Sequence, residues 1–169
     1  MNYLTEQILT SEEVEIIIDN LNKEELLWED VKQTAGTHAA RFKNNLQLKR
    51  DSDLSKKFSR LITKKILSNE LIKSFALPKN IHGTIFSKST KGMRYGRHID
   101  NVYMSSGRAD LSFTIFLSYK NNYEGGALSI EDFKSEEQFK LDAGELIIYP
   151  STYLHSVEEV VKGERLVFI

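Results

Sequence analysis

The sequence predicts an α+β fold, in which N-terminal helices support a double-stranded β-helix (jelly roll) core. Two stretches before residue 80 repeat apolar residues at helical spacing. From residue 81 onward, short runs rich in β-branched and aromatic residues are separated by turn signals. We expect a single domain over residues 1–169, with residues 1–80 mainly helical and residues 81–169 forming the jelly-roll core.

The first half is expected to begin with a strand and a capped helix. Thr10 and Glu13 form a capping box, in which each side chain can bind the backbone amide of the other residue. A proline cannot continue a helix, so Pro78 ends the helical part. The expected elements are, in order, a strand over residues 3–9, a helix after Thr10, strands over 26–33 and 44–49, a helix after Asp51 or Ser52, and a short helix over 69–76.

The second half is expected to contain short, evenly spaced strands, which is typical of a sandwich or jelly roll. A further strand should end near His98, after a turn over residues 91–96. The segment 101–110 is polar around a central glycine and is expected to be a loop. The other expected strands are residues 81–87, 112–118, 127–131, 138–141, 145–149 and 165–169.

The composition excludes several classes of protein. Of the 169 residues, 40% are hydrophobic and 28% charged, as in an ordinary globular protein. A net charge of −1 gives no positive field to attract nucleic acid or a membrane surface, so we expect neither as a partner. Cysteine is absent, so any metal must be held by His, Asp or Glu. No apolar run approaches the roughly 18 residues of a membrane span, and the N-terminus does not resemble a leader peptide. We therefore expect a cytoplasmic protein, of undetermined oligomeric state.

Three residues are candidates for a metal site. His98 and Asp100 are two positions apart, so on a strand they share a face and can hold one ion together. His155 follows a later apolar strand and can supply the third ligand. Two histidines and one carboxylate that leave open positions are typical of non-haem Fe(II) oxygenases. His38 and His82 lack such a neighbour and are not expected to bind the metal.

Each of these candidates, and Arg165, also has an ordinary structural role as its alternative. A His-x-Asp pair occurs often by chance, and a lone His155 is commonly a structural histidine. Arg165 begins an apolar strand, ten residues after His155, and its alternative is a solvent-facing position. If it faces inward, a buried guanidinium needs an anionic partner, and its planar donors suit a carboxylate. Together with the three metal candidates, this favours a carboxylate clamp.

Several motifs resemble those of one enzyme family. The segment Arg94–Asn101 (RYGRHIDN) resembles the Tyr-x-x-His-x-Asp-Asn core of prolyl 4-hydroxylase-like Fe(II)/2-oxoglutarate dioxygenases. The glycine pair in Tyr123–Leu128 and the run from Gly144 through His155 to Arg165 match the order of that family's later motifs. Residues 34–36 and 43–48 are similar to bacterial PKHD-type hydroxylases in particular.

The resemblance implies a role for each matching residue. His98, Asp100 and His155 would bind Fe(2+) and form the catalytic centre, and Arg165 would bind 2-oxoglutarate. Further cofactor-binding candidates are Tyr95, Tyr149 and Thr114, with packing as the alternative for Tyr95. The implied reaction hydroxylates a prolyl or other residue of a peptide or protein, with succinate and CO₂ as co-products. The resemblance leaves ascorbate binding open.

Two departures from the family pattern are visible. Phe86 and Phe116 lie near places where related prolyl hydroxylases often have tyrosine, so two hydroxyls that could assist Arg165 are expected to be missing. The chain also ends four residues after Arg165, earlier than PKHD-type proteins. Three alternatives remain: a hydroxylase of a free amino acid or small molecule, a non-catalytic metal- or 2-oxoglutarate-binding sensor, and a cupin-like isomerase, for which Arg165 would have no use.

Overall fold

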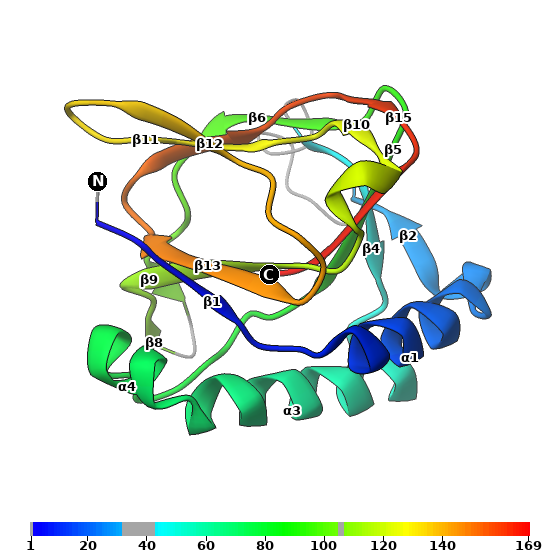
Figure 1. Cartoon of the computed structure of the whole chain (residues 1–169), viewed down its shortest axis with the longest axis horizontal. Coiled ribbons are helices and arrows are strands. Elements are labelled where there is room, and N and C mark those ends of the chain that lie inside the picture. The colour runs from blue at the N-terminus through cyan, green and yellow to red at the C-terminus, as the bar shows by residue number, and fades with distance from the viewer. Residues whose placement is uncertain (1, 32–42, 105–106) are drawn as a thin grey trace.

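In the described part of the chain, two large antiparallel sheets face each other and helices cover the outer side of one of them (Figure 1). The structure is a computed structural model that describes residues 2–31, 43–104 and 107–169. Within these residues the larger sheet contains, in spatial order, β1 (Leu4–Gln7), β13 (Glu145–Pro150), β9 (Leu111–Phe116), β16 (Glu164–Phe168), β5 (Phe86–Thr90), β4 (Leu46–Leu48) and β2 (Trp28–Asp30). The smaller sheet contains β12 (Glu136–Phe139), β11 (Leu128–Glu131), β14 (Leu154–Val157), β6 (Arg94–His98) and β3 (Lys43–Asn44).

The remaining described elements are helices and two short strand pairs. The helices that cover the larger sheet are α1 (Ser11–Asn22), α3 (Asp53–Ser68) and α4 (Glu70–Ala76). Single 3-10 turns occur at η1 (Glu25–Leu27) and η3 (Lys120–Asn122). The short pairs are β10 (Glu124–Gly125) with β15 (Val160–Lys162), and β7 (Tyr103–Met104) with β8 (Gly107–Arg108). Two facing antiparallel sheets confirm the predicted jelly-roll core with supporting helices.

The predicted helix caps and the helix end before Pro78 are present in the first half of the chain. The Thr10 hydroxyl accepts the Glu13 amide at 3.3 Å, and the Glu13 carboxylate accepts the Thr10 amide at 2.9 Å. The Ser52 hydroxyl caps α3, and α4 ends with Leu77 in the left-handed region immediately before Pro78. Four strands of the first half also join the two sheets, so the helical segments are anchored to the core through the backbone.

Several expected boundaries are wrong. The strand expected over residues 81–87 begins only at Phe86, and the turn expected over 91–96 is confined to its first residues because β6 already begins at Arg94. The expected strand over 44–49 is divided between the two sheets at Asn45. The segment 101–110 carries the β7–β8 hairpin, and its residues 105–106 lie outside the described part.

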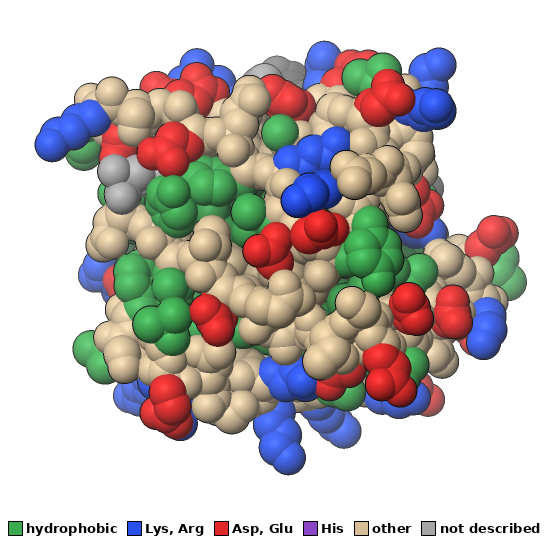
Figure 2. All heavy atoms as spheres, viewed as in Figure 1, with side chains coloured by type: hydrophobic (Ala, Val, Ile, Leu, Met, Phe, Trp, Pro, Cys, Tyr) green, Lys and Arg blue, Asp and Glu red, His purple; other side chains and the backbone are tan. Residues whose placement is uncertain are grey.

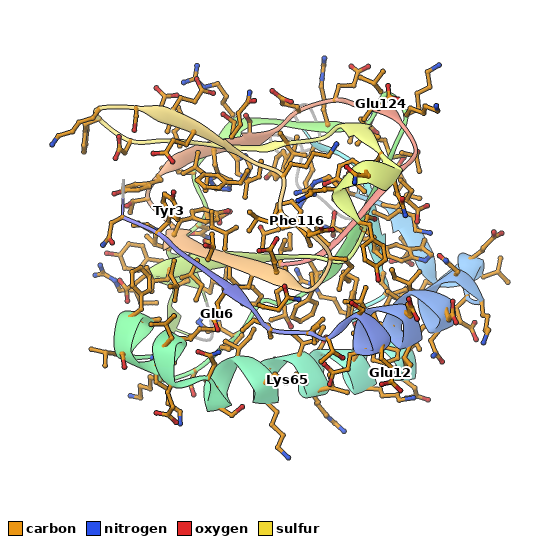
Figure 3. All side chains as sticks on the ribbon, viewed as in Figure 1. Tyr3, Glu6, Glu12, Lys65, Phe116 and Glu124 are labelled. Carbon is orange, nitrogen blue, oxygen red and sulfur yellow. The ribbon has the colours of Figure 1, made fainter. Side chains whose placement is uncertain are left out.

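Strand alternation divides the interior into two cores. In β9, β13 and β16, one set of side chains faces the helices and includes Ile115, Leu146 and Phe168. The alternate set lies between the two sheets and includes Phe116, whose central position is visible in Figure 3, and Val167. Each strand of the larger sheet therefore presents an apolar side to the helices and a second side to the interior of the jelly roll.

Charged side chains of both signs are spread over the molecular surface. On the face in Figure 2, acidic and basic side chains are intermingled rather than separated by sign. None of the helices in residues 2–31, 43–104 and 107–169 is both long and apolar enough to cross a membrane.

Gly144 joins the ends of three strands and gives a test of this packing. Its amide donates to Phe116 O at 2.8 Å, its carbonyl accepts the Ile8 and Leu9 amides, and its φ is +88°. A Cβ at this position would lie 2.3 Å from Leu9 O, which is backbone that cannot swing away.

We expect Gly144→Ala to lower the free energy of unfolding by more than the roughly 1–2 kcal/mol that a left-handed alanine costs by itself. The matched control is Gly92→Ala, because Gly92 has a φ of +83° but no atom within 4 Å of the added Cβ. Urea unfolding of both variants measures the difference. Equal losses would show that the contact with Leu9 costs nothing.

Candidate functional site

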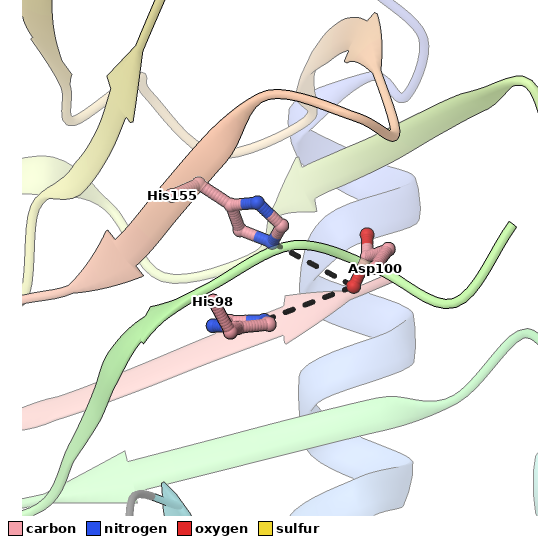
Figure 4. A group of neighbouring side chains, drawn as sticks. All are labelled: His98, Asp100 and His155. Atoms are coloured by element: carbon pink, nitrogen blue, oxygen red, sulfur yellow. Dashed lines mark ion pairs between the residues drawn. The ribbon is translucent and has the colours of Figure 1, made fainter.

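His98, Asp100 and His155 converge on one cavity of the jelly roll (Figure 4). His98 ends β6, and His155 on β14 is its direct cross-strand partner, so the two imidazoles come from neighbouring strands of the smaller sheet. Asp100 lies two residues beyond β6, and its Oδ1 is 3.7 Å from Nε2 of each histidine. One ligand atom from each residue lies within 4.8 Å of the others.

Both imidazoles are held in the orientation that a metal ligand needs. Nδ1 of His98 lies 2.8 Å from Gly96 O, and Nδ1 of His155 lies 3.0 Å from Tyr153 O. A carbonyl can only accept, so each Nδ1 carries a proton and each Nε2 is left to face Asp100. Burial and the neighbouring His155 lower the pKa of His98 to about 4, so its imidazole is neutral at pH 7.

The Asp100 carboxylate is fixed from the opposite sheet. Its Oδ2 accepts the Ser112 hydroxyl at 2.5 Å, and the Ser151 hydroxyl lies 2.9 Å from that of Ser112. The Asp100 amide donates to Ser151 O at 3.2 Å. Asn101 accepts the Tyr103 amide at 3.1 Å and so stabilises the turn that follows Asp100. Supports of this kind orient metal ligands.

Ser112 and Ser151 were not predicted as site residues. Ser112 shares a face of β9 with Thr114, which was, so strand alternation gave a signal for Ser112. Ser151 follows the last residue of β13, and only the tertiary structure brings it to the site. His82 lines the cavity but is not one of the grouped ligands, and His38 lies outside the described residues.

Arg165 faces the interior. It is only 3% exposed, lies opposite Ser89 of β5, and shares the inner face of β16 with Val167. The solvent-facing alternative is therefore wrong. No carboxylate of the described residues lies within ion-pair distance of its guanidinium, and its Nε is buried without a hydrogen-bond acceptor there. Burial lowers the pKa of Arg165, an effect that the phenols of Tyr123 and Tyr149 oppose.

The expected loss of two hydroxyls near Arg165 is only partly correct. Phe86 is fully buried on the helix side, where its ring lies 4.7 Å from that of Phe168, so it does not face the site. Phe116 does face inward, and its ring centroid lies 5.4 Å from the Arg165 guanidinium carbon. The β5 side chains that line the cavity are Ser87 and Ser89.

Tyr95, Tyr149 and Thr114 line the same cavity as the three grouped ligands and Arg165. The Tyr95 ring stacks on the His98 ring with centroids 3.6 Å apart, and the Lys43 ammonium lies 4.8 Å from the Tyr95 centroid. Burial, and then the Asp100 charge, raise the pKa of Tyr149, and a hydrogen bond with Thr114 opposes this shift. All three phenol and hydroxyl groups are therefore neutral polar neighbours of the ligands.

The cavity that these residues line has a volume of about 220 Å³. A second hollow of about 480 Å³ extends beside it toward α4. The residues common to both linings are His82, Ala109, Leu111, Ser112 and Phe113. The two hollows therefore adjoin, and the space beside the grouped ligands continues along the surface.

Comparison with solved structures places the fold. A prolyl-4-hydroxylase from Pseudomonas putida matches with a TM-score of 0.70 and 15% identity, over 98% of this chain and 89% of that one. A prolyl hydroxylase from Trichoplax adhaerens, solved with a hypoxia-inducible factor peptide fragment, matches with a TM-score of 0.66 and 15% identity, over 98% and 81% of the two chains. At this identity the likeness shows the jelly-roll fold.

Sequence relatives are much nearer. A PKHD-type hydroxylase of Prochlorococcus marinus strain MIT 9312 is 68% identical over all of this chain and 76% of its own length. The PKHD-type hydroxylase of strain MIT 9211 is 50% identical over the same shares. The model of the 2OG-Fe(II) oxygenase superfamily matches residues 84–169. The chain therefore belongs to the 2OG-Fe(II) oxygenase superfamily and is an oxygenase of a family that uses Fe(II) and 2-oxoglutarate.

Proposed function

We propose that this oxygenase hydroxylates a prolyl or other residue within a peptide or protein, with succinate and CO₂ as co-products. The proposal includes one domain over residues 1–169, in which residues 1–80 support a catalytic core formed by 81–169. Its parts are the metal ligands, the co-substrate clamp and the entry of the substrate, and each rests on different residues.

The proposed metal ligands are His98, Asp100 and His155. Two imidazoles and a carboxylate are a donor set that suits Fe(II), and their ligand atoms already lie within 4.8 Å of one another. When bound, Fe(II) and 2-oxoglutarate supply the activation of O₂ that this chemistry requires. The protein contributes imidazoles held in one tautomer and a carboxylate held by Ser112, so the ligands need little rearrangement.

The proposed clamp for 2-oxoglutarate is Arg165. A buried guanidinium without a carboxylate partner among the described residues is costly unless an anion joins it. The distal carboxylate of 2-oxoglutarate is such an anion, and it matches the planar donors. Tyr95, Tyr149 and Thr114 line the same cavity as Arg165 and the metal ligands, so they can contact a co-substrate bound there.

The two adjoining hollows are the observation that carries the peptide or protein substrate. Sites that enclose a small organic ligand typically measure about 300–1,000 Å³. The cavity beside the metal ligands measures about 220 Å³, and it adjoins a second hollow of about 480 Å³. A peptide substrate would place one side chain beside the ligands while the rest of its chain follows the adjoining hollow.

The rim of the cavity supports the same substrate class. On β7, next to the cavity, Tyr103 is 71% exposed and Met104 is also exposed. Such side chains can pack on a bound polypeptide, and aromatic residues commonly dominate the energy of contacts of this kind. The prolyl hydroxylase from Trichoplax adhaerens, which shares the fold, was solved with a peptide fragment.

Mass spectrometry tests the proposal. The Fe(II)-loaded protein is incubated with 2-oxoglutarate, O₂ and a library of proline-containing peptides, and succinate and peptides that gain one oxygen atom are measured. Oxidised peptide with matching succinate supports the proposal. Oxidation of free amino acids alone would overturn the substrate class, and 2-oxoglutarate binding without any turnover would favour a sensor. Ascorbate dependence stays a prediction, which the same assay tests by omitting the reductant.

We expect Tyr103→Ala to raise the KM for a peptide substrate about tenfold with little change in kcat, because it removes an aromatic contact outside the reacting centre. Phe133→Ala is the matched control, since Phe133 is a fully exposed aromatic residue in the connection between β11 and β12 rather than on β7. Steady-state kinetics with one peptide measures both variants. An unchanged KM for Tyr103→Ala would place the bound chain elsewhere.

A further inference from the structure

The buried guanidinium of Arg165 is surrounded by neutral groups. The Phe116 ring lies with its centroid 5.4 Å from the guanidinium carbon, and the Tyr123 side chain lies beside the guanidinium and interacts with it. Carboxylates of the described residues do not pair with it. A charged side chain that is nine-tenths or more buried usually has a counter-ion, so this environment is unusual for an arginine.

Tyr123 is itself firmly held. It follows η3, is 3% exposed, and its ring lies 4.1 Å from the Lys140 ammonium, which also donates to Tyr123 O at 2.7 Å. Within the described residues its hydroxyl is buried without a well-formed hydrogen bond, as is Nε of Arg165. The Tyr123 hydroxyl and the Arg165 guanidinium interact with each other, so each can satisfy a polar group of the other.

Tyr123 and Arg165 both pack closely against Gly126. A Cβ at this position would lie 3.1 Å from Arg165 Cδ, 3.2 Å from Tyr123 Cε2 and 3.0 Å from a methyl group of Val160. The φ of Gly126 is +67°, a conformation that other residues adopt with strain. The second glycine of the Gly125–Gly126 pair thus lets Tyr123 and Arg165 pack against the same stretch of backbone.

We propose that Tyr123 is a positioning residue that orients the Arg165 guanidinium toward the cavity without neutralising its charge. A carboxylate in the same place would bind the guanidinium and compete with the ligand anion, whereas a phenol is neutral. Burial raises the pKa of Tyr123, so the phenol stays protonated at neutral pH. Tyr123 does not line the cavity, so it acts through Arg165. The inference rests on the proposed binding of 2-oxoglutarate by Arg165.

This role also explains the phenylalanine at position 116. Its ring can stack on the guanidinium but cannot hydrogen-bond to it, so orientation has to come from another element. The Tyr123 hydroxyl enters from the turn before β10, which follows β9 in the chain. The clamp is therefore built from one charged donor group, one aromatic face and one hydroxyl.

The test compares two ligands of the Mn(II)-loaded protein by calorimetry. One is 2-oxoglutarate, and the other is 2-oxopentanoate, which keeps the keto acid end but has a methyl group in place of the distal carboxylate. We expect Tyr123→Phe to weaken 2-oxoglutarate binding about three- to tenfold, as for one lost hydrogen bond, and to leave 2-oxopentanoate and Mn(II) binding unchanged. Tyr119→Phe, four residues earlier in the chain, is the matched control and should change neither.

The outcomes are distinguishable. Equal 2-oxoglutarate affinity in the parent and Tyr123→Phe would overturn the inference. Equal weakening of both ligands, or loss of Mn(II) binding, would also overturn it, because Tyr123 would then have a general structural role. If the parent protein itself does not prefer 2-oxoglutarate to 2-oxopentanoate, it is the proposed Arg165 clamp that fails.

Discussion

Replacing Asp100 with alanine is expected to weaken Mn(II) binding by more than about 100-fold, the upper range of what even supporting residues of metal sites contribute. Asp100 supplies the single carboxylate of the proposed ligand set, and its Oδ1 is the atom that faces both imidazoles. His98→Ala should have a comparable effect. Calorimetric titration with Mn(II) under argon measures the affinities.

Two variants serve as controls for the metal site. Asp110→Ala removes an exposed carboxylate that pairs with Arg108 and does not face the imidazoles. His82→Ala removes a histidine that lines the same cavity without being grouped with the ligands. Both should bind Mn(II) as the parent does. Normal binding by Asp100→Ala would show that the metal site lies elsewhere.

Arg165→Lys is expected to weaken 2-oxoglutarate binding roughly ten- to hundredfold. The lysine keeps the charge but loses the planar pair of donors that can hold both oxygens of a carboxylate, and a charged hydrogen bond is worth about 1.5–3 kcal/mol. Mn(II) affinity should barely change, because Arg165 is not one of the grouped ligands. Titration of 2-oxoglutarate into the Mn(II)-loaded variant gives the result.

The matched control for Arg165 is Arg94→Lys. Arg94 is an exposed arginine on β6 that lies near Glu159 and does not line the cavity. It tests whether any arginine-to-lysine change alters affinity through the overall charge distribution. If Arg165→Lys binds 2-oxoglutarate as tightly as the parent, another group holds the distal carboxylate.

Strand alternation explains why much of the site was predictable from the sequence. In β16, Arg165 and Val167 face one side and Leu166 and Phe168 the other, so an apolar strand with one arginine at an alternate position already places that arginine on a face. The capping box at Thr10 was equally predictable because all of its partners are local. Residues whose neighbours lie close in sequence leave a pattern that sequence reasoning can use.

Other parts of the site depend on contacts between distant segments. Tyr123 contacts Arg165, which lies 42 positions later in the sequence. Ser151 contacts Asp100 only because β13 ends beside it. The exact start of β5 was missed because Ile81 and Ile85 suggest a strand, whereas Gly83 between them has a φ of +74° and β5 begins only after Ile85, whose amide and carbonyl bond with Ile169. No local signal marks the contacts of Tyr123 and Ser151, so the sequence left them open.

The pairing of β16 links correct folding to the safe use of a reactive cofactor. A slip of one residue against β5 would turn Arg165 toward the helices and put Leu166 or Glu164 in its place. Such a chain would lose both its apolar packing and, on the proposed function, the group that holds the co-substrate. On the proposed function, a misregistered molecule would therefore be unable to bind the co-substrate that starts the oxidation, as well as being unstable.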